Sequence, residues 1–109
     1  MQAQFIHDGS ALDYTPAEDT AAGSIVIIGD LVGITKRDIK ADTLGSIAVE
    51  GVFDVPKDPV EAVAFTAGQK VYVDVDGEPR SLATGNKYLG KTLAAAVATD
   101  TSVRVLLSP

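Results

Sequence analysis

Residue types used in nucleophilic catalysis stand almost side by side near the start of the chain, at His7, Asp8 and Ser10. A nucleophile, its base and the acid that orients the base must converge from different directions, which neighbours on one strand and turn rarely do. His7 is the only histidine and therefore the only imidazole available as a base. We interpret the segment as a turn with polar caps, and we predict no catalytic residue and no enzymatic activity.

A second group of chemically capable residues is the acidic row Asp74, Asp76 and Glu78 around Gly77. Carboxylate oxygens are suitable ligands for a hard cation such as calcium, but the ligand spacing of a calcium loop of roughly twelve residues is missing. Asp76-Gly77 is also the strongest two-residue hairpin turn in the chain. We interpret the row as a solvated hairpin, and a small cation-binding or ligand-binding β-domain remains an alternative.

Composition excludes several other functions. Cysteine is absent, which removes thiol chemistry and thiolate metal sites, and no glycine-rich phosphate loop precedes a helical pattern. The net charge of -6 argues against a nucleic-acid partner. No apolar stretch approaches the roughly 20 residues of a membrane-spanning helix. We therefore predict no cofactor, no metal site, no nucleic-acid partner and no membrane partner.

The element that organises the chain is the stretch from residue 45 to residue 56. Ile47, Val49, Phe53 and Val55 alternate with mostly polar or smaller residues, as in a half-buried strand. Gly51 interrupts the apolar row, where a bulge could bend the strand or a neighbour could approach. We expect one long strand around which the others wrap.

Similar short runs, separated by turn signals, recur along the 109 residues. They predict one all-β domain over residues 1–109, a small barrel or sandwich of short antiparallel strands with a short N-terminal arm. At most one short helical turn is expected, after Pro56, where Asp58 can cap it. Residues 94–98 are expected to be strand or irregular. The other expected strands are residues 5–10, 12–14, 24–28, 31–35, 71–75, 78–82, 88–93 and 103–107.

The chain is rich in aliphatic residues and poor in aromatic ones, with 46% hydrophobic residues but only 6% aromatic. A domain of this size cannot bury both faces of so many strands, so some outward apolar side chains are expected between subunits. The interface candidates are Val26, Ile28, Val52, Tyr72 and Leu106.

Five segments together resemble a family of small tailed-phage and prophage proteins of formerly unknown function. They are residues 29–34 (GDLVGI), 48–57 (AVEGVFDVPK), 68–74 (GQKVYVD), 88–90 (YLG) and 103–107 (VRVLL). The family pattern reads GxLxGI, A/VEGVFxLPK, GxxVYWD and VRVxL in this order, and the resemblance covers nearly the whole chain. Val73 stands where relatives usually have tryptophan, so a subunit contact made by that tryptophan would be built differently here.

This family is similar to capsid decoration, or cement, proteins. The resemblance implies a structural, homotrimeric subunit that binds the phage major capsid protein on the surface of the virion and is made in the cytoplasm of the bacterial host. Capsid-contact candidates are Gln2, Gln4 and Phe5, in the N-terminal arm. A recombination-associated phage accessory protein remains an alternative from family annotation, although no ATP loop or basic surplus accompanies it.

Overall fold

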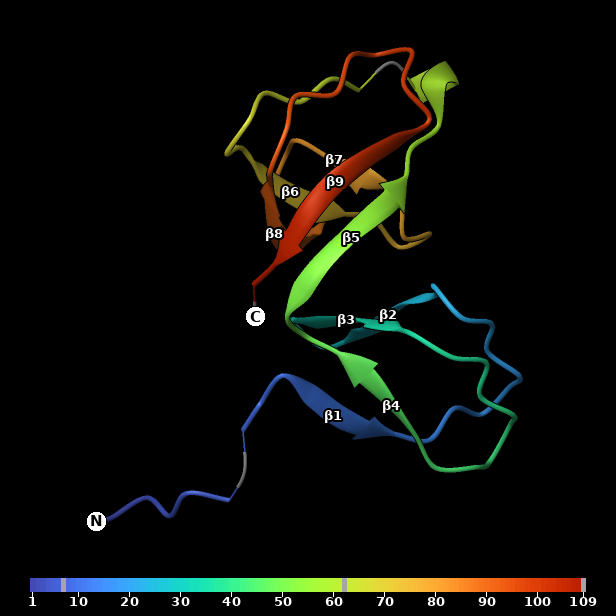
Figure 1. Cartoon of the computed structure of the whole chain (residues 1–109), viewed down its shortest axis with the longest axis vertical. Coiled ribbons are helices and arrows are strands. Elements are labelled where there is room, and N and C mark those ends of the chain that lie inside the picture. Colours follow the sequence, from blue (N-terminus) through green and yellow to red (C-terminus); the bar gives the residue numbers. More distant parts are fainter. Residues whose placement is uncertain (7, 62, 109) are drawn as a thin grey trace.

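The protein, here as a computed structural model, is built from two antiparallel sheets that pack together without closing into a barrel (Figure 1). The structure describes residues 1–6, 8–61 and 63–108, without the side chain of Glu61. The all-β prediction is thus confirmed, and of its two forms the arrangement matches the sandwich.

The four-stranded sheet has the order β1-β4-β3-β2 and the five-stranded sheet the order β5-β9-β8-β6-β7. The first contains β1 (Ala11–Tyr14), β2 (Ile25–Ile28), β3 (Leu31–Thr35) and β4 (Gly45–Ala48). The second contains β5 (Gly51–Pro56), β6 (Lys70–Val73), β7 (Pro79–Arg80), β8 (Lys87–Thr92) and β9 (Ser102–Leu107), and η1 (Pro59–Glu61) is a single 3-10 turn after β5.

The stretch from residue 45 to residue 56 is central, but the prediction of one continuous strand is wrong. It divides at Val49 and Glu50 into β4 of one sheet and β5 of the other, and Figure 1 shows β5 leading from the lower sheet into the upper one. Gly51 has a φ of 120°, a conformation that L side chains rarely adopt. The glycine therefore acts at the corner where the chain changes sheets, and it bends the strand rather than admitting a neighbour.

The core lies between the sheets, where β3 packs against β8. Val32 and Ile34 of β3 meet inward-facing residues of the five-stranded sheet, and Phe53 packs partly buried against them. The buried residues of the five-stranded sheet are largely β-branched, which suits a pleated surface. They are Val55, Val71, Val73, Leu89, Val103, Val105 and Leu107.

Close backbone packing inside the five-stranded sheet depends on Gly90 of β8. A Cβ atom there would lie 2.0 Å from the carbonyl oxygen of Leu106 on β9, closer than any two such atoms can approach. The Tyr-Leu-Gly segment noted in the sequence thus marks a position where only glycine fits between two paired strands.

Several local predictions are confirmed. Asp58 caps η1, since its Oδ1 accepts the N–H of Val60 at 2.9 Å. The proline-containing β7 is an edge strand. Residues 94–98 are irregular apart from a bridge between Ala96 and Phe65.

The sequence predicts that residues 5–10 form a short strand that runs into a turn at Asp8-Gly9; the strand is wrong over its described part, because Phe5 and Ile6 form no strand. Phe5 and Ile6 are exposed, and no neighbouring strand pairs with them. Without ladder hydrogen bonds or burial, nothing offsets the conformational entropy of an extended strand.

Candidate binding surfaces

The residues first considered for catalysis are not assembled into a described site. His7 lies outside the described residues, while Asp8 and Ser10 are exposed in the segment before β1. Ser10 acts through its backbone, whose carbonyl accepts the N–H of Val49 at 3.0 Å. Within the described part of the chain, no group of three or more His, Asp or Glu side chains could hold a metal ion.

The acidic hairpin is organised around Asp74, which follows β6. Its Oδ1 accepts the backbone N–H groups of Asp76 at 2.9 Å and Glu78 at 3.0 Å. Its Oδ2 accepts Nε of Arg80 at 3.0 Å and forms an ion pair with Nη2 at 2.9 Å. The carboxylate that would be the first cation ligand is thus directed into its own turn.

The ionisation of Asp74 reflects these contacts. Partial burial acts to raise the pKa of its carboxyl group. Hydrogen bonds from the Glu78 amide, the Arg80 side chain and the Asp76 amide outweigh burial, so the pKa lies below its usual value. Asp74 is thus an ionised anchor of the hairpin.

The outer face of β5 and β9 carries an uncovered apolar pair. Val52 and Leu106 are directly opposite each other in the register and are 53% and 44% exposed. The next outward pair is Asp54 opposite Arg104, joined by two hydrogen bonds of 2.9 and 3.2 Å. An apolar centre beside a polar margin is the usual anatomy of a protein interface.

The Asp54–Arg104 pair is held by its hydrogen bonds in a fixed fork geometry. The hydrogen bond from Arg104 lowers the pKa of Asp54, and the same contact raises the pKa of Arg104. Both groups are exposed, so the pair contributes orientation more than stability.

The other three interface candidates differ in how far their side chains are exposed. Ile28, at the end of β2, is 47% exposed. Tyr72 is half-buried and makes an edge-to-face contact with Tyr88 at 5.8 Å between ring centroids. Val26 lies on the face of β2 opposite Ile25 and Ile27, which pack against the core, yet it is only 8% exposed, so the expectation that it is open to a second subunit is wrong.

Val73, which replaces the tryptophan of related sequences, also lies inside the domain, with no exposed surface. The N-terminal residues differ from Val73 in being open to solvent. Gln2, Gln4 and Phe5 are all exposed, and Figure 1 shows this segment leading away from both sheets.

One polar feature that the sequence reasoning missed is Lys57, which is only 4% exposed. Its ammonium donates hydrogen bonds to the carbonyl oxygens of Val97, Ala98 and Asp100 at 2.9, 2.9 and 3.1 Å. Lys57 thereby fastens the loop before β9 to the end of β5. The only signal in the sequence was the lysine at the end of the AVEGVFDVPK segment.

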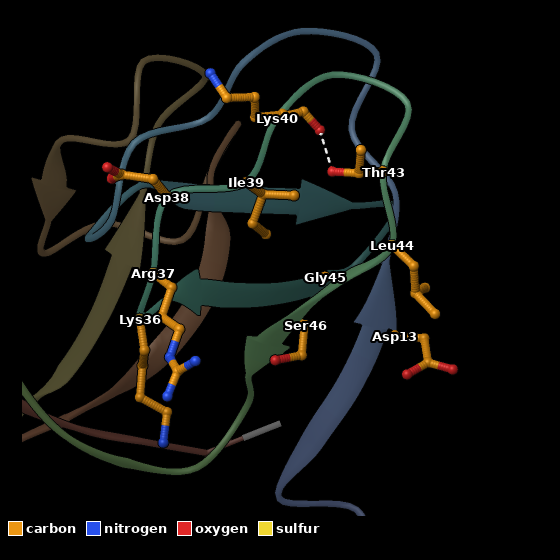
Figure 2. Close-up of a pocket in the computed structure, with 10 residues that line it drawn as sticks. All are labelled: Asp13, Lys36, Arg37, Asp38, Ile39, Lys40, Thr43, Leu44, Gly45 and Ser46. Atoms are coloured by element: carbon orange, nitrogen blue, oxygen red, sulfur yellow. Dashed lines mark hydrogen bonds between the residues drawn. The ribbon is translucent and has the colours of Figure 1, made fainter.

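A groove of about 900 Å³, shown in Figure 2, lies beside the loop of residues 36–44, which contains Lys36, Arg37 and Lys40. Most of this loop is exposed, but Ile39 is buried and bridges Thr20.

These observations define a small all-β binding module. Its outward features are an apolar strand pair, an exposed N-terminal segment and a groove that contains Lys36 and Arg37, while Lys57 and Asp74 serve local structure. The described residues include no helix long and apolar enough to cross a bilayer.

Comparison with protein families matches residues 6–107 to the phage cement proteins. The match spans nearly the whole chain, so the protein belongs to the phage cement protein family. This confirms the resemblance found in the sequence motifs, and it places the chain in a structural rather than an enzymatic family. No curated protein and no solved structure shows significant similarity to the chain.

Proposed function

We propose that this protein is a homotrimeric decoration subunit that binds the major capsid protein on the outer surface of a phage head. The family membership supports a role at the capsid. The single structural observation that supports self-association is the Val52–Leu106 pair, two large apolar side chains left uncovered side by side on a flat strand face.

Such a subunit stabilises the shell by mass action. A ligand that binds the expanded shell, and not its dissociated parts, shifts the equilibrium toward the shell. A trimer presents three identical contacts, so attachment gains avidity without strong individual contacts. A closed ring also satisfies identical patches without leaving an open end.

Light scattering after size exclusion tests the trimer, and we expect three times the 11.3 kDa chain mass. Val52→Asp and Leu106→Asp should shift the mass downward, since a buried and unpaired charge costs several kcal/mol. Val60→Asp is the matched control because Val60 is 87% exposed on η1, outside the strand pair. A strictly monomeric wild type at high micromolar concentration would refute the trimer.

Capsid binding is tested by mixing the protein with undecorated expanded heads of its own phage and sedimenting them. We propose that the N-terminal residues Gln2, Gln4 and Phe5 contact the shell, since they are exposed and pack on neither sheet. Removal of residues 1–5 should weaken co-sedimentation while leaving the oligomeric mass unchanged. Failure of the full-length protein to co-sediment would refute the decoration role.

The two alternative functions have tests of their own. A recombination-associated protein should retard duplex or single-stranded DNA at low salt, whereas we expect no retardation from an acidic chain. A cation-binding domain should melt at a higher temperature with calcium, whereas the internal hydrogen bonds of Asp74 argue for no change.

A further inference from the structure

Lys36 and Arg37 form a pair of exposed cations at one wall of the groove. Figure 2 shows their side chains lying side by side and pointing the same way, along a groove of about 900 Å³. Arg80, Lys87 and Arg104 have acidic partners, whereas the exposed Lys40, Lys70 and Lys91 form no ion pair with a described carboxylate; what sets Lys36 and Arg37 apart is that the two are adjacent. No described carboxylate lies within ion-pair distance of Lys36 or Arg37. Two adjacent like charges without a counter-charge are unfavourable in the isolated chain.

The nearest acid in the sequence, Asp38, is used elsewhere. Its Oδ1 accepts the backbone N–H of Ala22 at 2.8 Å, and Figure 2 shows its side chain on the other side of the loop from Lys36 and Arg37. The local acid therefore stabilises the loop rather than neutralising the pair.

The loop is fixed in place by hydrogen bonds to the preceding polar segment. Ile39 and Thr20 exchange two backbone hydrogen bonds of 2.8 Å. The N–H of Ala41 donates to Oδ1 of Asp19 at 2.9 Å. A surface loop held in this way does not have to be ordered when a partner binds, which lowers the cost of binding.

Packing fixes the loop as well. A Cβ atom at Gly45 would lie 2.6 Å from Cδ1 of Ile39, so the isoleucine side chain rests directly on the glycine backbone. Ile39 is buried by this contact. Gly45 is thus required for the shape of the groove, which it lines together with Ser46.

We propose that this groove docks carboxylates of a second copy of the chain; the inference rests on the self-association proposed above and names a surface that contributes to it. The chain has 15 acidic and 9 basic residues, so copies at a net charge of -6 repel unless complementary patches meet. Lys36 and Arg37 supply the positive patch.

A second copy supplies exposed carboxylates in return. Asp76 and Glu78 of the hairpin, for example, form no ion pair with a described cation. Asp13 and Leu44 line the groove across from the cations in Figure 2. An incoming carboxylate is therefore attracted to the wall with Lys36 and Arg37 and repelled by Asp13 at the opposite wall. A contact between two different patches is heterologous, the type that closes into a ring.

The test compares Arg37→Glu with Lys70→Glu by light scattering over a range of concentrations, at about 50 mM and about 500 mM salt. The two variants change the net charge equally, but Lys70 is exposed at the start of β6 and does not line the groove. At low salt, Arg37→Glu should raise the half-dissociation concentration at least about fivefold, because an ion pair becomes a repulsion at every contact. Lys70→Glu should change it less than about twofold. High salt should weaken the wild type and reduce the difference.

The outcomes separate this inference from the proposed function. A monomeric wild type refutes self-association itself. A wild-type trimer that is insensitive both to salt and to Arg37→Glu refutes only the role of the groove. A variant that keeps its trimer mass but no longer co-sediments with heads would show that the groove docks the shell, which also overturns the inference. Unchanged circular dichroism spectra of both variants ensure that a loss of assembly reflects the surface and not the fold; the melting temperature itself depends on assembly.

Discussion

Replacing Lys57 with methionine should destabilise the protein more than any substitution of an exposed lysine. Methionine keeps most of the length and apolar volume of the stem but removes the ammonium. Three backbone carbonyl oxygens, of Val97, Ala98 and Asp100, then lose their donor. The perturbation thus isolates the polar role of a buried side chain from its packing.

The magnitude follows from two opposing effects. A hydrogen bond to a charged group contributes about 1.5–3 kcal/mol, and Lys57 makes three of them. Burial of an ammonium costs several kcal/mol, which offsets a large part of that gain. Because the carbonyl groups remain without a donor, we expect Lys57→Met to lower the free energy of unfolding by about 2–4 kcal/mol. For a domain of this size the melting temperature should fall by roughly 10–20 °C.

Urea denaturation of Lys57→Met, with the exposed Lys91→Met as matched control, measures the loss. The control should change stability by less than about 0.5 kcal/mol. Hydrogen exchange should also show reduced protection of the Lys57 amide, which donates to the Thr101 carbonyl at 2.9 Å. A loss no larger than that of the control would mean that water replaces the ammonium at the carbonyl groups, and the reasoning would be refuted.

Three further predictions concern the sheets and the hairpin. Phe53→Ala should cost about 3 kcal/mol, at the low end for a core aromatic since Phe53 is only partly buried, and Glu50→Ala should cost little; equal small losses in chemical denaturation would contradict the register. Gly90→Ala should abolish cooperative thermal unfolding or force a displacement of β9, visible as lost amide protection, because its Cβ would meet the Leu106 carbonyl. Asp74 has a lowered folded pKa, so its contribution to stability is present at neutral pH and lost as pH falls below about 4; Asp74→Asn should flatten the dependence of the urea midpoint on pH in that range.

The sequence motifs alone indicated the family, and the family comparison bore them out. Strand periodicity also predicted β9 correctly: Val103, Val105 and Leu107 are buried and alternate with exposed residues. The edge position of β7 agrees with its Pro79, whose missing N–H group cannot donate a hydrogen bond to a neighbouring strand. These properties follow from side-chain alternation and from the missing N–H group of proline, both of which are visible in the sequence.

The path of the chain between the sheets could not be predicted in this way. Alternation continues from Ile47 to Val55, and nothing in it reveals that β4 and β5 pair with different partners. The burial of Val26 could not be predicted either, because Val26 lies on the face of β2 away from the core, opposite Ile25 and Ile27, and alternation does not reveal that this face is also covered.

The sequence by itself thus predicted most of the strands, the turn at Asp76-Gly77 and the family to which the chain belongs, because these follow from local periodicity, backbone restriction and ordered motifs. Only the tertiary structure decided that Lys57 is buried against three carbonyl groups, that Asp74 is directed into its own hairpin, and that no described carboxylate pairs with Lys36 or Arg37. Charge and polarity are properties of a residue, but their satisfaction depends on groups brought close by folding from distant parts of the chain, such as the 40 residues that separate Lys57 from Val97.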